Sequence, residues 1–209
     1  LKLTPAVLGI LLLYNKQWKE AIRTVIYGLI LGMVPFLFFH GGLVNIGRMF
    51  HNAALNVQAY SSTEGTTIVA ALVAFGVNAT DGMIKIVKCI TYVIVLLLFI
   101  QCLFYKEKWE VIMAVSMVLI IAPSHSGYYC IMYLIPAAIA FLNAKEHSYS
   151  DLLILFSIIL IVMDFQCDLF EYVLNYHLAI MLILAVLLIR GFVRMYDVIK
   201  HKSDNSMAK

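Results

Sequence analysis

The sequence contains little charge: only 13% of its 209 residues are Asp, Glu, Lys or Arg, whereas 63% are hydrophobic. Soluble domains carry about 25% charged residues, so this composition excludes a water-soluble globular protein. The net charge of +3 is also too small to indicate a nucleic-acid partner, which selects a strongly basic surface. The chain is therefore predicted to be an integral protein of the lipid bilayer.

Regularly spaced cysteines are absent as well. The four cysteines, at positions 89, 102, 130 and 167, form no Cys-x-x-Cys or Cys-x-x-His motif, and three of them lie inside apolar runs. Zinc sites and disulfide frameworks need such spacing. We therefore interpret the cysteines as packing residues, and we predict neither a metal nor a cofactor.

The alternation of apolar and polar residues that marks membrane β-strands is also missing. Apolar residues instead form long unbroken runs, which indicate membrane helices. We predict an all-α, polytopic transmembrane bundle that forms one domain over residues 1–209, with spans at Ile22–Phe39, Met83–Phe104 and Tyr176–Ile189. Shorter apolar runs cover residues 3–14, 111–122, 130–142 and 152–163.

Two polar segments lie between or after these runs. Within residues 40–81, apolar residues recur at helical spacing from Leu43 to Tyr60, which predicts an amphipathic helix along the membrane surface. A second short helix, Thr66–Val77, is predicted to be re-entrant or interfacial because about 20 residues are needed to span. Residues 190–209 are interpreted as a basic polar tail, with residues 194–209 in the cytoplasm and a disordered end.

A turn-forming polar island, Ala122 to Tyr129 (APSHSGYY), separates two of the short apolar runs. Pro123 and Gly127 stop a helix and allow a sharp reversal. The flanking runs are shorter than the bilayer core, which is about 30 Å thick, so the tip of this hairpin is predicted to lie below the membrane surface. Polar backbone at that depth lines a watered cavity or is buried in protein, so the hairpin is a candidate site.

The basic residues predict the orientation, because lysine and arginine collect on the cytoplasmic side. With the turn at residues 15–20 inside the cell, the cytoplasmic side receives eleven of the fifteen basic residues. These are Lys16, Lys19, Arg23, Lys106, Lys108, Lys145, Arg190, Arg194, Lys200, Lys202 and Lys209. The hairpin and residues 40–81 then face outward, and we predict a multi-pass protein of the plasma (inner) membrane with its site on the outer face.

Two stretches resemble glycosyltransferase family 87. One is Leu1 to Leu8 (LKLTPAVL), followed by the basic turn Lys16 to Lys19, and the other is the hairpin, which runs into Leu134-Ile135-Pro136. The resemblance implies a GT-C-type, mannosyltransferase-like enzyme that uses a polyprenyl-phosphate sugar as donor and a lipid or glycan as acceptor. It further implies that the chain is the C-terminal part of such an enzyme, with the catalytic carboxylate expected upstream of Leu1.

This reaction needs hydrogen-bond donors and cations for the departing phosphate. Lys2, at a helix end, suits the phosphate, Arg48 on the amphipathic helix is a further cation, and the hairpin supplies hydrogen-bonding side chains. The predicted donor-binding residues are Lys2, Arg48, Ser124, His125, Ser126, Tyr128 and Tyr129.

Two other classes of function remain open from the sequence. In a transporter or channel-like subunit, the recessed hairpin and the short helices would line a substrate path. Lys85 and Lys88, near a helix end, are the only charges clearly inside a predicted span, and no internal repeat is visible. The third class is a non-catalytic protein of a membrane assembly.

Overall fold

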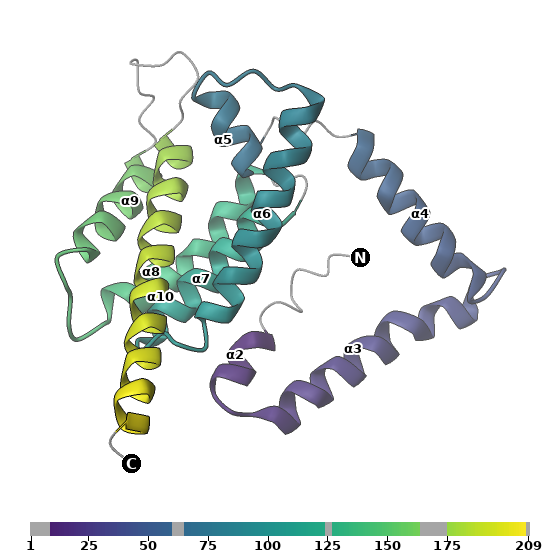
Figure 1. Ribbon diagram of the computed structural model, residues 1–209. Coiled ribbons are helices and arrows are strands. Elements are labelled where there is room, and N and C mark those ends of the chain that lie inside the picture. Colours follow the sequence, from purple (N-terminus) through teal and green to yellow (C-terminus); the bar gives the residue numbers. More distant parts are fainter. Residues whose placement is uncertain (1–8, 60–64, 124–126, 164–174, 208–209) are drawn as a thin grey trace. The chain divides into compact units, whose positions relative to one another are not determined.

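The computed structural model describes residues 9–59, 65–123, 127–163 and 175–207. In these ranges every regular element is a helix (Figure 1), which confirms the predicted all-α class. The chain divides into two compact units, residues 1–61 and residues 62–209, and each is described by itself.

The first unit is built on one long apolar helix. A short helix, α2 (Gly9–Tyr14), precedes α3 (Trp18–Phe38), whose 21 residues extend about 31 Å at 1.5 Å per residue. Phe36 is the one buried residue of α3, and its other apolar side chains are exposed or half-exposed. An apolar helix without a polar face is suited to lipid contact on all sides.

An amphipathic helix follows in the same unit. Gly41 and Gly42 have positive φ angles of 101° and 54°, a conformation that glycine adopts without strain, and they turn the chain between α3 and the next helix. That helix, α4 (Val44–Ala59), lies within one residue at each end of the predicted helix Leu43–Tyr60.

The second unit is a bundle whose helices alternate in direction along the chain (Figure 1). We call the end where α6 and α10 begin the upper end, and the end where α7 and α9 begin the lower end. Its elements are α5 (Ile68–Ala74), α6 (Asp81–Gln101), α7 (Lys108–Ile121), the 3₁₀ helix η1 (Tyr128–Tyr133), α8 (Leu134–Leu142), α9 (Asp151–Met163) and α10 (Asn175–Met207).

The core of this unit is α7. Every residue of this helix except Lys108 and Ile112 is buried, and it contacts α6, α8 and α10. A helix that is hydrophobic on all sides is stable only when other elements surround it. The apolar run before the hairpin, expected to be a short membrane helix, is therefore the central helix of the bundle.

Among the residues that the structure describes, three helices are long and apolar enough to cross a membrane: α3, α6 and residues 175–200 of α10. Each overlaps one of the three spans predicted from the sequence, and the last extends eleven residues beyond the predicted end at Ile189. The apolar helices around α8 and α9, at residues 130–142 and 151–162, are shorter. The length and composition of these helices support a membrane protein.

The structure describes two of the expected segments more closely. α5 is the short helix expected within residues 66–77, and its Ile68, Val69, Ala70, Ala71 and Ala74 are buried against α6 and α10. This burial does not fit the interfacial alternative, while the re-entrant alternative stays a prediction. The segment from Arg190 onward, expected to be a polar tail, is helical, because α10 continues through it to Met207.

Arg190 joins three helices at the lower end of the unit. Its Nη1 donates to Glu110 Oε1 (3.0 Å) in the first turn of α7, and its Nη2 donates to Asp151 Oδ1 at the start of α9. The Nε and Nη2 groups also donate to Ser150 Oγ (3.1 and 2.7 Å), and the guanidinium lies 5.2 Å from the centre of the Trp109 ring. Both carboxylates are buried, so this pairing offsets the cost of removing them from water.

A close approach of α6 and α10 adjoins this cluster. Gln101, fully buried at the end of α6, donates to the backbone oxygen of Leu188 (3.2 Å), and the Tyr105 hydroxyl donates to that of Leu187 (2.9 Å). A Cβ atom added to Gly191 would lie 2.1 Å from Gln101 Cδ. The neighbouring Cys102 is also buried, so this end of α6 is shielded from water.

Replacing Arg190 with Met is expected to lower the free energy of unfolding by about 3–5 kcal/mol, because Glu110 and Asp151 would remain buried without a counter-charge. Chemical unfolding in detergent measures the loss. Arg23→Met is the control, because the pair of Arg23 with Glu20 (2.8 Å) is exposed and such pairs contribute about 0–1 kcal/mol. Equal losses in the two variants would contradict a stabilising role for the cluster.

Gly191→Ala is expected to destabilise the protein by about 1–3 kcal/mol, because the new methyl group would force the fully buried Gln101 side chain to shift and to give up its hydrogen bond to Leu188. Gly28→Ala in α3 is the matched control, since no heavy atom lies within 4 Å of a Cβ added there. Thermal unfolding of both variants in the same detergent compares them. An unchanged transition for Gly191→Ala would show that the two helices can separate at little cost.

Candidate functional site

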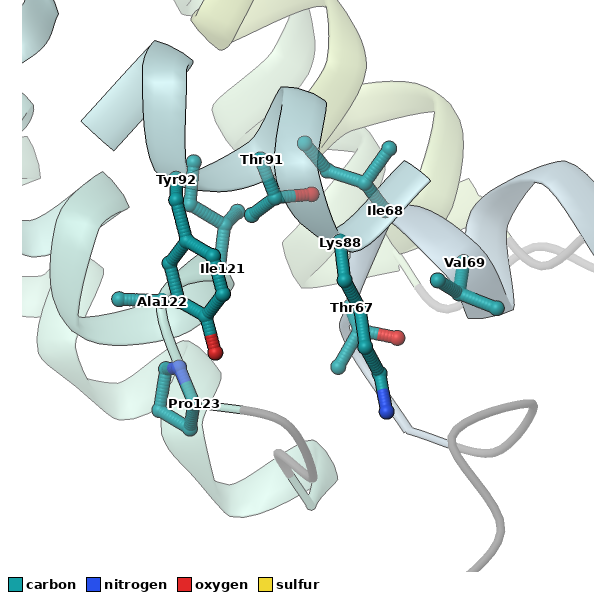
Figure 2. A pocket seen from close by; sticks show the side chains of 9 residues that line it. All are labelled: Thr67, Ile68, Val69, Lys88, Thr91, Tyr92, Ile121, Ala122 and Pro123. Atoms are coloured by element: carbon teal, nitrogen blue, oxygen red, sulfur yellow. The ribbon is translucent and has the colours of Figure 1, made fainter. Parts of the chain in front are cut away.

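A small pocket lies at the upper end of the second unit, where α5, α6 and the end of α7 meet (Figure 2). Its volume is about 20 Å³, and a water molecule needs about 10–15 Å³ on the same measure. It therefore has room for a water or the tip of one polar group, whereas a sugar ring would have to lie outside it. The lining residues are Thr67, Ile68, Val69, Lys88, Thr91, Tyr92, Ile121, Ala122 and Pro123.

The α5 wall of the pocket is fixed by a turn and a cap. Gly65 has a φ angle of 90°, a conformation that glycine adopts without strain. Thr67 then caps α5, because its hydroxyl oxygen accepts from the backbone N–H of Ala70 (3.1 Å). Thr66 and Thr67 are both buried, so this segment is held inside the protein.

The α6 wall presents residues at i, i+3 and i+4, which share one face of a helix. They are Lys88, Thr91 and Tyr92. The Thr91 hydroxyl donates to the backbone oxygen of Val87 (2.8 Å), so its proton is used within the helix. Lys88 lies seven residues after Asp81, the first residue of α6, or about 10 Å along the helix axis.

Lys88 is the cation of the pocket. Its side chain is half-buried, and in the part of the chain that the structure describes no carboxylate forms an ion pair with it. Figure 2 shows its ammonium group pointing to the same side as the Tyr92 hydroxyl. A lysine without a counter-charge inside a membrane helix attracts an anionic ligand and marks a functional site.

The third wall connects the pocket to the predicted hairpin. Pro123 lines the pocket directly after the end of α7, and Tyr128 and Tyr129 begin η1, which continues into α8. Ser124, His125 and Ser126 lie outside the described residues. The structure therefore brings the start of the hairpin to Lys88, a neighbour that the sequence did not indicate.

Two of the predicted cations belong to the first unit, which is described by itself. Lys2 lies outside the described residues, and Arg48 is exposed on α4, in the first unit. Lys88 was missed as a site residue because a lysine near a helix end resembles an interfacial anchor. Its position two turns inside an apolar span was the signal that could have identified it.

Metal binding finds no support in the ranges that the structure describes. No three His, Cys, Asp or Glu side chains come together there. The charged cluster around Arg190 is satisfied by its own partners, so it does not offer a free ligand group. The pocket around Lys88 is thus the stronger candidate for chemistry, and its one charged group suits an anion.

Comparison with known proteins supplies one match. The family model described as glycosyltransferase family 87 matches residues 1–125, more than half of the 209 residues. All nine residues that line the pocket lie within this segment. No curated protein and no solved structure matches the chain.

Proposed function

Because the chain belongs to glycosyltransferase family 87, we propose that its reaction is the transfer of a mannose-like hexose from a polyprenyl-phosphate donor to a lipid or glycan acceptor. The family match is the observation that carries this proposal. It favours an enzyme over a transporter subunit or a passive assembly protein, and the three helices long enough to cross a membrane suit a donor that is itself anchored in lipid.

Lys88 is proposed to hold the phosphate of the donor. As the glycosidic bond breaks, negative charge develops on the departing phosphate, and a fixed cation stabilises that charge. Lys88 has no counter-charge among the described residues, and it lies about 10 Å along the helix axis from the first residue of α6. The apolar side chains on the outside of α6, including Ile86, Ile90 and Val93, are exposed and would contact the polyprenyl chain.

The hairpin is proposed to complete the donor site. Ser124, His125 and Ser126 follow Pro123 directly in the sequence, and Pro123 lines the pocket. Since the pocket itself is too small for a hexose, these side chains would bind the sugar at its mouth. Tyr128 and Tyr129 begin the next helix and are proposed as further hydrogen-bonding groups. Lys2 and Arg48 remain predicted donor-binding residues.

The site is proposed to face the outside of the plasma membrane. The lower end of the second unit carries Lys106, Lys108, Lys145 and Arg194, whereas the upper end carries Lys85 and Lys88. The excess of basic residues belongs on the cytoplasmic side, so the upper end, with the pocket, would face outward.

Labelling with a membrane-impermeant maleimide in intact cells tests this orientation. In a background without native cysteines, Asn78→Cys, an exposed position just before α6, is expected to react. Tyr149→Cys, at a side chain that is 94% exposed in the loop before α9, is expected to stay unlabelled until the cells are permeabilised. The reverse pattern would place the pocket on the cytoplasmic side.

Lys88→Met in the full-length protein is expected to reduce the rate of hexose transfer by roughly 10²–10³-fold, the usual effect of removing one preorganised group that stabilises charge. Transfer from a radiolabelled polyprenyl-phosphate hexose in proteoliposomes measures the rate. Lys85→Met is the control: Lys85 is exposed one turn earlier and does not line the pocket. Equal losses in the two variants would show that the rate depends on positive charge near the membrane surface and not on a cation in the pocket.

A further inference from the structure

His177 connects α10 to the wall of the pocket. Its imidazole is only 4% exposed, and its Nε2 lies 2.9 Å from the backbone oxygen of Gly65. A carbonyl oxygen can only accept a hydrogen bond, so Nε2 must carry the proton and donate. This hydrogen bond joins residues 112 positions apart in the chain: His177 in α10, and Gly65 three residues before the start of α5.

The bond to Gly65 is the principal polar restraint on this ring. The second ring nitrogen, Nδ1, is buried and has no hydrogen-bond partner among the described residues. The ring also contacts the Tyr176 ring, with 4.4 Å between centroids. Buried polar atoms are normally hydrogen-bonded. Because Nε2 is the one nitrogen of this buried ring with a partner among the described residues, its hydrogen bond to Gly65 calls for an explanation.

Gly65 needs such a restraint. It begins the segment Gly65–Thr67, and its φ angle of 90° gives the chain a conformation that only glycine adopts easily. Two residues later, Thr67 caps α5 and lines the pocket together with Lys88. Because α5 has only seven residues, its own hydrogen bonds are too few to fix this segment in place.

We propose that His177 is a positioning residue for the pocket: by holding the Gly65 carbonyl it fixes the Gly65–Thr67 wall opposite Lys88, and so sets the affinity for the phosphate of the donor. His177 lies outside residues 1–125, the part of the chain matched by the family model. The inference rests on the proposed function for the identity of the ligand, but the role of His177 in holding the wall can be measured without it.

Two substitutions of His177 separate the hydrogen bond from the rest of the side chain. In His177→Gln, the amide nitrogen reaches about the position of Nε2 and can still donate to Gly65. In His177→Asn, the amide is one carbon shorter and cannot reach it. Gly191→Ala, in the middle of α10 beside Arg190, serves as a control that lowers stability without touching the pocket.

Hydrogen exchange of residues 65–74 in the full-length protein reports on the wall. We expect exchange to accelerate in His177→Asn and to stay close to wild type in His177→Gln and Gly191→Ala. Kinetics with a polyprenyl-phosphate hexose report on function: His177→Asn is expected to lose roughly 10- to 100-fold in kcat/KM, as for a misplaced binding group. This loss should appear mainly as a higher KM for the donor, and His177→Gln should restore it.

Three results would overturn the proposal. One is unchanged exchange of residues 65–74 in His177→Asn, another is a His177→Gln variant that behaves like His177→Asn, and the third is an equal rise of KM in Gly191→Ala. If the wild-type protein transfers no hexose from this donor, the proposed function fails. The exchange comparison then decides by itself whether His177 holds the wall.

Discussion

The second unit depends on the pairing of Arg190 with the carboxylates of Glu110 and Asp151. Each of these charges is expensive to bury alone, and the cost falls only when all three are present together. Since Glu110 lies in the first turn of α7 and Asp151 begins α9, pairing both carboxylates with Arg190 requires three helices to meet at the same level of the bundle. The apolar side chains of these helices could slide past one another at little cost, whereas this cluster fixes their register.

The upper end of the unit has a different character. It contains no comparable cluster of paired charges among the described residues; its one half-buried cation at the pocket, Lys88, has no carboxylate partner there. At this end the hydrogen bond from His177 to Gly65 adds to the apolar packing of α5. The lower end is fixed by paired charges as well as by packing, so the upper end is expected to be the more adaptable of the two.

The sequence predicted the features that depend on local composition. Long apolar runs indicate spanning helices whatever surrounds them, so α3, α6 and α10 were found, and the helical spacing of apolar residues identified α4. The family was recognised from short motifs at the N-terminus and in the hairpin. These properties are all contained in segments of fewer than about 25 residues.

Features that depend on contacts between distant segments were not predicted. The partners of Arg190 lie 80 and 39 residues away, so the sequence alone presented Arg190 as the start of a polar tail. The same reason explains the burial of α5, whose short apolar sequence fits a membrane surface equally well. Lys88 was seen as a charge near a helix end, and only its neighbours Thr67 and Pro123, from two other elements, make it part of a site.

The length of α7 has a further consequence for a protein in a bilayer. Its 14 residues measure about 21 Å, whereas the hydrocarbon layer is about 30 Å thick. The central helix is therefore shorter than that layer, unlike α6 and α10, which are long enough to cross it. Where such a helix ends within the layer, its last backbone carbonyls need hydrogen-bond donors from protein or from water, because lipid chains offer none.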